Sequence, residues 1–154
     1  MPTHPSRLFA GLLLILGGGV VAVSALAIGL ARLLVEGGMV IRPADAVLLG
    51  DLVALLPFIV AFAVANLVAA AGLLLGSSWA DRLGVGVAIV GATAGTLGLL
   101  LVGVGRDPFA PAATARSTAD GIGILAVATA LYVLVIVAID AARRSRTIVQ
   151  GAAA

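Results

Sequence analysis

The chain has 154 residues, of which 62% are hydrophobic, 10% charged and 4% aromatic, and its formal net charge is +2. Soluble domains carry about 45–50% apolar and about 25% charged residues, so this composition excludes a soluble globular protein. Intrinsic disorder requires low hydrophobicity and high charge, and it is excluded as well. The class that remains is an integral membrane protein, in keeping with a mean hydropathy of +1.27.

Four apolar stretches are long enough to cross a bilayer, which requires about 20 residues. They cover residues 8–33, 50–75, 83–105 and 120–141. This pattern predicts an all-α membrane protein, a single domain of four antiparallel transmembrane helices, with extramembrane loops at residues 34–49 and 106–119. The first stretch is longer than the apolar region of about 7–15 residues in a signal peptide, which favours a retained helix over cleavage after Ala27.

Four spans place both termini on the same side of the membrane. That side holds Arg7, Arg82 and the cluster of Arg143, Arg144 and Arg146, against four arginines on the other side. By the positive-inside rule, this distribution favours cytoplasmic termini in the plasma membrane. The cluster next to a membrane helix is typical of an anchor to anionic lipid headgroups.

The two halves of the chain carry similar residues at similar positions, and we call this similarity the echo. An arginine opens both the first and the third span, and Arg32 and Arg42 recur at the same spacing as Arg106 and Arg116. Two tandem helical hairpins, related as a parallel repeat, would explain the echo. Coincidence in a chain built from few residue types would explain it equally well.

Small residues recur on one face of three predicted helices. Such residues allow the close contact that helices need in lipid, where no strong hydrophobic attraction acts between them. Those of the first and third helices include Gly18, Ala22, Gly29, Gly91, Gly95 and Gly98, and those of the second include Ala54, Ala61, Ala65 and Gly72. Packing within the chain is the favoured interpretation, and a seam between copies of the chain is the alternative.

Polar residues inside a membrane are costly and therefore mark candidate functional sites. No ionisable residue lies in the middle of a predicted span, which disfavours proton-coupled exporters and rotor subunits that need a buried carboxylate. Asn66 is the deepest strongly polar residue. A hydrogen bond to a neighbouring helix is its favoured role, and ligand binding is the alternative. Pro57, in the same span, predicts a kink near Val53.

Charged residues gather at the outer ends of the predicted spans. Arg32 ends the first span, and Asp51 and Asp120 open the second and fourth, where an acid complements the helix dipole. We expect a salt bridge of Arg32 with Asp51 or Asp120. The alternative is a ligand-binding site formed by Arg32, Asp51, Asn66 and Asp120.

Catalytic and metal-binding patterns are missing from the sequence. The chain has no cysteine, and its single histidine is His4, so we expect no metal site, no cofactor and no enzyme. The arginines form no basic face with interleaved aromatics, so we expect no nucleic-acid partner. Asp140 and Arg143, three residues apart at the inner end, are expected to form a surface pair.

The middle of the chain carries a resemblance, in the segments NLVAAAGLLLG (residues 66–76) and WADRLG (residues 79–84). It resembles a loose group of small bacterial four-helix membrane proteins of unknown function. In that group a small-residue helix ends in a short Trp-Ala-Arg turn and re-enters the membrane, whereas here Asp81 comes before Arg82. The resemblance implies the four-helix fold and brings no activity.

The large packing surface and the small polar content favour a non-enzymatic accessory or assembly protein of the membrane. Such a protein would pack with a larger membrane partner or with itself, and the lipid bilayer would be its environment. The alternative is a bundle that binds or transports a lipid or small ligand, in a cavity that opens to the outer face.

Overall fold

The computed structural model describes the backbone of residues 5–103 and 115–151. It contains four helices, α1 (Pro5–Glu36), α2 (Pro43–Leu74), α3 (Ala80–Gly103) and α4 (Ala115–Gly151). No strand occurs in the described ranges. Each helix holds an apolar segment long enough to cross a membrane, so the prediction of an all-helical chain with four candidate spans is confirmed.

All four helices are longer than a hydrocarbon layer requires, and α3 exceeds it least. Helices α1 and α2 have 32 residues each, α3 has 24 and α4 has 37. At 1.5 Å per residue these lengths correspond to about 48, 36 and 56 Å, against a hydrocarbon thickness of about 30 Å. Helices α1, α2 and α4 therefore either tilt strongly or continue beyond the apolar layer.

The connection between α1 and α2 is shorter than the predicted loop over residues 34–49. Helix α1 continues to Glu36 and α2 begins at Pro43, so only residues 37–42 join them. Proline suits the first turn of a helix because its fixed φ is helical and the backbone N–H groups there have no partner within the helix. Asp45, in the same turn, places a negative charge at the positive end of the helix dipole. Hydropathy finds only the apolar part of such a helix. Most of the second predicted loop, over residues 106–119, lies outside the described residues.

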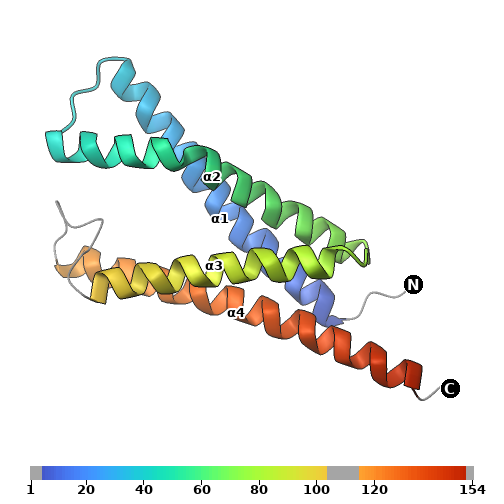
Figure 1. Ribbon diagram of the computed structural model, residues 1–154. Helices are drawn as coiled ribbons and strands as arrows, with labels where there is room; N and C mark the ends of the chain where they lie inside the picture. Colours follow the sequence, from blue (N-terminus) through green and yellow to red (C-terminus); the bar gives the residue numbers. More distant parts are fainter. Residues whose placement is uncertain (1–4, 104–114, 152–154) are drawn as a thin grey trace.

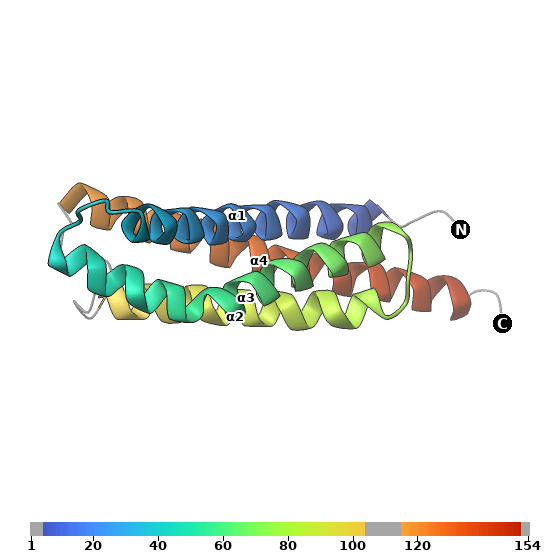
Figure 2. The same cartoon turned by 90° about the horizontal axis from the view of Figure 1, so that it is seen from above.

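The start of α1, the end of α4 and the turn between α2 and α3 lie at one end of the molecule, which we call the terminal end (Figures 1 and 2). The connection between α1 and α2 lies at the opposite end, which we call the loop end. Helix α1 packs against α2 and α4, and α3 packs against the same two helices. The order around the bundle is therefore α1, α2, α3, α4.

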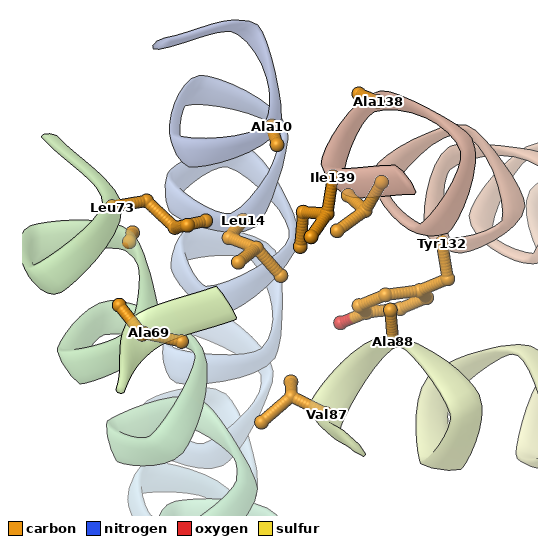
Figure 3. Packing of buried hydrophobic residues seen from close by; sticks show 12 residues of the cluster. Ala10, Leu14, Ala69, Leu73, Val87, Ala88, Tyr132, Ala138 and Ile139 are labelled. Carbon is orange, nitrogen blue, oxygen red and sulfur yellow. The ribbon is translucent and has the colours of Figure 1, made fainter. Parts of the chain in front are cut away.

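The buried core lies in the half of the bundle near the terminal end. Figure 3 shows Leu14 and Ile139 directed toward each other across this core, with the ring of Tyr132 beside Ala88. Toward the loop end, α1 and α2 diverge from α3 and α4 (Figure 1). Between Pro43 and Phe62, α2 has no buried side chain among those described. The bundle is therefore packed at the terminal end and open at the loop end.

Helix α2 changes direction along its length in both views (Figures 1 and 2). Pro57 lies inside this helix. A proline inside a helix removes one backbone donor and its ring crowds the preceding turn, so a bend is the expected result. The bend agrees with the kink that the sequence predicts.

Two glycines end the helices of the first half. Gly38 and Gly76 have positive φ angles of 98° and 76°. At the end of α2, the N–H of Ser77 donates to the carbonyl of Gly72 at 2.9 Å. The N–H of Gly76 donates to the carbonyl of Leu73 at 3.2 Å. This is the Schellman arrangement, and the same pair of bonds follows α1. Both helices are thus stopped by a residue without a Cβ.

We predict that Gly76→Ala lowers the free energy of unfolding by about 1–2 kcal/mol, because a Cβ is unfavourable in the left-handed region. Gly19→Ala is the matched control, since a Cβ there meets no atom within 4 Å. Unfolding in mixed micelles, followed by circular dichroism as dodecyl sulfate is added, measures both. Equal effects of the two substitutions would contradict the role assigned to Gly76.

Candidate functional site

The deepest polar contact of the structure joins α2 to α4. Asn66 is 0% exposed and Tyr132 is 7% exposed. The Tyr132 hydroxyl donates to Oδ1 of Asn66 at 3.2 Å, and Nδ2 of Asn66 donates to the carbonyl of Phe62 at 2.8 Å. The rings of Phe62 and Tyr132 lie 5.8 Å apart between centroids. Asn66 therefore bonds a second helix, which agrees with its favoured role in the sequence.

Helices α2 and α4 are not neighbours in the bundle, so this bond crosses its centre. Glycines of the two intervening helices make the crossing possible. A Cβ on Gly91 of α3 would lie 2.5 Å from the Tyr132 ring, and one on Gly17 of α1 would lie 3.0 Å from its hydroxyl. A Cβ on Gly18 would lie 2.8 Å from Cβ of Asn66. The side chains of Asn66 and Tyr132 thus occupy space that these glycines leave free.

The small-residue stripe of α3 faces α4 of the same chain. Added Cβ atoms on Gly84 and Gly98 would lie 3.0 Å from Ile139 and 3.2 Å from Leu125, and one on Gly95 would clash with the hydroxyl of Thr129. Together with Gly91, these residues form the contact between α3 and α4. The GxxxG pair of Gly91 and Gly95 is therefore used inside the chain.

The other two stripes follow the core less closely. On α1, Gly18 is buried and Ala22 is half-buried, but a Cβ on Gly29 would meet nothing within 4 Å. On α2, the expected face is wrong in part, because Ala54 and Ala61 are exposed. The buried face of α2 is formed by Ala63, Asn66, Ala69, Ala70, Gly72 and Leu73. Both helices carry small residues on several of their faces, so the spacing of small residues alone does not predict which face is packed.

The second polar contact is a buried ion pair at the terminal end. Nη2 and Nε of Arg7 donate to Oδ1 of Asp81 at 2.6 and 2.9 Å. Nη2 also donates to the carbonyl of Ser77 at 2.7 Å. Arg7 is 3% exposed and Asp81 is 6% exposed. The first turn of α1 is thus fixed to the first turn of α3 and to the turn that precedes it.

This pair is not predicted from the sequence. There Arg7 counts toward the balance of positive charge across the membrane, and Asp81 interrupts the turn before the third span. The sequence does contain a signal for this ion pair, because Arg7 and Asp81 carry opposite charges and lie in the first turns of two helices that start on the same side. Removing charges from water is costly, so a buried pair is retained only with good geometry and further hydrogen bonds, and the Ser77 carbonyl supplies one.

The salt bridge expected between Arg32 and Asp51 is not formed, and the alternative with Asp120 falls on a side chain outside the described residues. Nε of Arg32 donates to Oε1 of Glu36 at 2.7 Å, on the same helix and exposed. Because α1 continues past its predicted end, Glu36 lies one helical turn from Arg32, where such pairs form readily. Asp51 is exposed and makes no hydrogen bond or ion pair with the described residues. The side chain of Asp120 lies outside those residues.

Asp140 pairs with a different arginine from the one expected. Its Oδ2 lies 2.7 Å from Nη2 of Arg144, four residues along α4, rather than from Arg143. Both spacings place two side chains on one helix face, and the structure selects the longer one. Arg143 is exposed, and the side chain of Arg146 is not among those described.

A groove of about 750 Å³ runs between α1 and α4. Its lining is apolar except for Tyr132, and Asn66 is not among the lining residues. A smaller hollow of about 230 Å³ lies at the loop end beside Arg32, Glu36, Gly50 and Val53. The four candidate ligand-binding residues therefore do not meet in one described cavity: Asn66 is in the core, and Arg32 and Asp51 are exposed at the loop end.

We predict that Asp81→Asn lowers the free energy of unfolding by about 3–5 kcal/mol, because it leaves the guanidinium of Arg7 buried without a charged partner. Asp140→Asn, which breaks an exposed pair, is the control and should cost about 0.5 kcal/mol or less. Micellar unfolding measures both. A double variant, Arg7→Met with Asp81→Leu, should recover most of the loss, and a failure to do so would argue against a charge effect.

We also predict that Gly91→Ala lowers the free energy of unfolding by about 1–3 kcal/mol, because the added methyl group collides with the Tyr132 ring. Gly86→Ala, on the same helix but with open space around it, should cost nothing. In a double-mutant cycle with Tyr132→Ala, the effect of Gly91→Ala should disappear. Additive losses would show that the ring is not the obstacle.

Neither contact resembles a catalytic centre. Within residues 5–103 and 115–151, no three His, Cys, Asp or Glu side chains gather to hold a metal ion. In the same part of the chain, every buried side-chain nitrogen and oxygen has a hydrogen-bond partner. Comparison of the chain with protein families, with curated proteins and with solved structures finds no match. Its function must therefore be inferred from its own residues.

Proposed function

We propose that the chain is a non-enzymatic integral membrane protein of accessory or assembly type, packing with a larger membrane partner or with itself. The observation that carries this proposal is the use of its buried polar groups. Arg7, Asn66 and Asp81 are the buried polar and charged residues described, and all three bond other parts of the same chain. They stabilise the bundle, and among the described residues no buried side-chain nitrogen or oxygen is left unpartnered toward a substrate.

The surface of the bundle supports the same proposal. Large apolar side chains are exposed on all four helices, including Leu26, Leu33, Phe58, Val64, Leu97, Leu100, Ile124 and Val127. Lipid tails cover some of these side chains. Because no hydrophobic attraction selects helix partners in lipid, association depends on shape and on hydrogen bonds. A rigid bundle with an apolar exterior is suited to such packing.

For the topology, we propose an antiparallel bundle of two helical hairpins in the plasma membrane of a bacterium, with cytoplasmic termini. The arginines near the terminal end support this orientation. We propose that Arg143, Arg144 and Arg146, near the end of α4, lie against anionic headgroups. Trp79, half-exposed at the same end, suits an interfacial anchor.

The groove between α1 and α4 favours a second candidate function, the binding or transport of a lipid or small apolar ligand. Its volume of about 750 Å³ falls within the range of small-molecule sites. This groove differs from the cavity near Arg32, Asp51, Asn66 and Asp120 that the sequence suggests, because its lining carries no charge. Its occupant would therefore be a hydrocarbon chain.

The test is affinity purification of the chain in mild detergent, with mass analysis of the bound proteins and lipids. A larger membrane protein or a second copy in fixed stoichiometry is the expected result. Val127→Trp fills the groove, and Val133→Trp, on the outside of the same helix, is its control. A lone chain that carries a lipid, lost only in Val127→Trp, would replace the proposal by the second candidate.

A further inference from the structure

A crevice of about 560 Å³ between α3 and α4 has charged residues at one end. It is lined by Val85 of α3 and by residues of α4 that include Val137, Asp140, Ala141, Arg143 and Arg144. Along α4, Val137 comes first and Arg144 last, which separates them by about 10 Å along the helix axis. The crevice is thus apolar toward the middle of the candidate span and charged toward the terminal end.

The charged end of the crevice lies at the level of Trp79. Gly84 of α3 packs on Ile139 of α4, and later glycines of α3 meet earlier residues of α4. Trp79 lies five residues before Gly84. Arg144 lies five residues after Ile139, so it reaches about the same level as Trp79. Tryptophan is enriched where a membrane protein meets the headgroups, so the arginines of the crevice are at the depth of lipid phosphates.

The crevice carries one unbalanced positive charge. Oδ2 of Asp140 lies 2.7 Å from Nη2 of Arg144, so the charges of these two side chains balance each other. Arg143 is exposed and forms no ion pair with the described residues. A phosphodiester carries a single negative charge, and a guanidinium binds two phosphate oxygens through parallel hydrogen bonds. The charge and the donors of Arg143 therefore suit one phosphodiester.

We propose that the crevice binds one anionic phospholipid, with its phosphate at Arg143 and Arg144 and one acyl chain along Val85 and Val137. A phospholipid in a bilayer has its charge at the interface and its chains toward the middle, which is the order of residues in the crevice. Basic pockets between transmembrane helices bind acidic headgroups in this way. The inference rests on the proposed function, which places these arginines against anionic headgroups, and it names the crevice and its single occupant.

The crevice should distinguish phosphatidylglycerol from phosphatidylcholine. The choline group of phosphatidylcholine would bring a second positive charge next to Arg143. The acid of the crevice, Asp140, already pairs with Arg144 and is not available to that charge. The groove between α1 and α4 has no such selectivity, because its lining carries no charge.

The first test is native mass spectrometry of the full chain in mild detergent, titrated with phosphatidylglycerol or phosphatidylcholine. Phosphatidylglycerol should bind more tightly, with one molecule per chain. Arg143→Gln should raise its dissociation constant about fivefold, the effect of one arginine near an anionic surface. Arg82→Gln is the matched control, because it removes an exposed arginine of the same end that does not line the crevice. Equal affinity for the two lipids, or equal effects of the two substitutions, overturns the proposal.

The second test concerns the acyl chain. Ala141→Trp fills the crevice and leaves its charges in place, so it should abolish the preference for phosphatidylglycerol. Leu134→Trp, on the same helix and exposed outside the crevice, is the control and should retain that preference. Equal retention in both variants overturns the proposed course of the chain. Inorganic phosphate that binds as tightly as phosphatidylglycerol would show a site for free phosphate and overturn the lipid as its occupant.

These outcomes separate the inference from the function on which it rests. A chain that co-purifies with a membrane partner, or with itself, and binds both lipids equally overturns the inference alone. A chain that binds one phosphatidylglycerol through Arg143 and has no protein partner overturns the accessory function and leaves the lipid site standing. A chain with neither a protein partner nor a lipid preference overturns both.

Discussion

The hydrogen bond between Tyr132 and Asn66 joins the two helices that face each other across the bundle, and glycines of the other two helices lie against its two side chains. An amide left alone in hydrocarbon is costly, so Asn66 has to find a partner within the chain. The nearest hydroxyl is on a large ring, and the ring has room only because Gly17 and Gly91 carry no side chain. The contact between Asn66 of α2 and Tyr132 therefore requires glycine at Gly17 of α1 and Gly91 of α3. In water, apolar attraction could hold such a core together, but in lipid the fit and the hydrogen bond must do so.

The two ends of the bundle differ in a way that follows from their contacts. At the terminal end, the Arg7–Asp81 pair, the turn at Gly76 and the core around Leu14 hold all the helices together. At the loop end, the charged residues pair locally, Arg32 with Glu36 and Arg42 with Asp45, and these bonds connect no two helices. The first and second halves of the chain can therefore separate at that end without breaking a described ion pair. Rigidity is concentrated where the termini lie.

The four helices could be predicted because long apolar runs leave few other structures, but their ends could not. Hydropathy reports only the part of a helix in the apolar layer, so it missed the polar turns that carry Glu36 and Pro43. The depth of Asn66 was readable from its place in the second span. Its partner was not, because pairing with Tyr132 depends on the rotation of two helices that are not neighbours. The Arg7–Asp81 pair was missed because each residue, taken alone, looks like an ordinary charge at a helix end.

The distance along the chain between Arg7 and Asp81 has a consequence for how the protein is made. The partners are 74 residues apart. At a synthesis rate of about 5–20 residues per second, Asp81 is therefore added to the chain roughly 4–15 s after Arg7. An unpaired arginine is expensive inside hydrocarbon, which keeps the start of α1 at the headgroups during that time. The first turn of α1 therefore lacks its partner until the first turn of α3 has been synthesised. The contacts that fix the first turn of α1 can therefore form only after the start of α3, in the second half of the chain, has been synthesised.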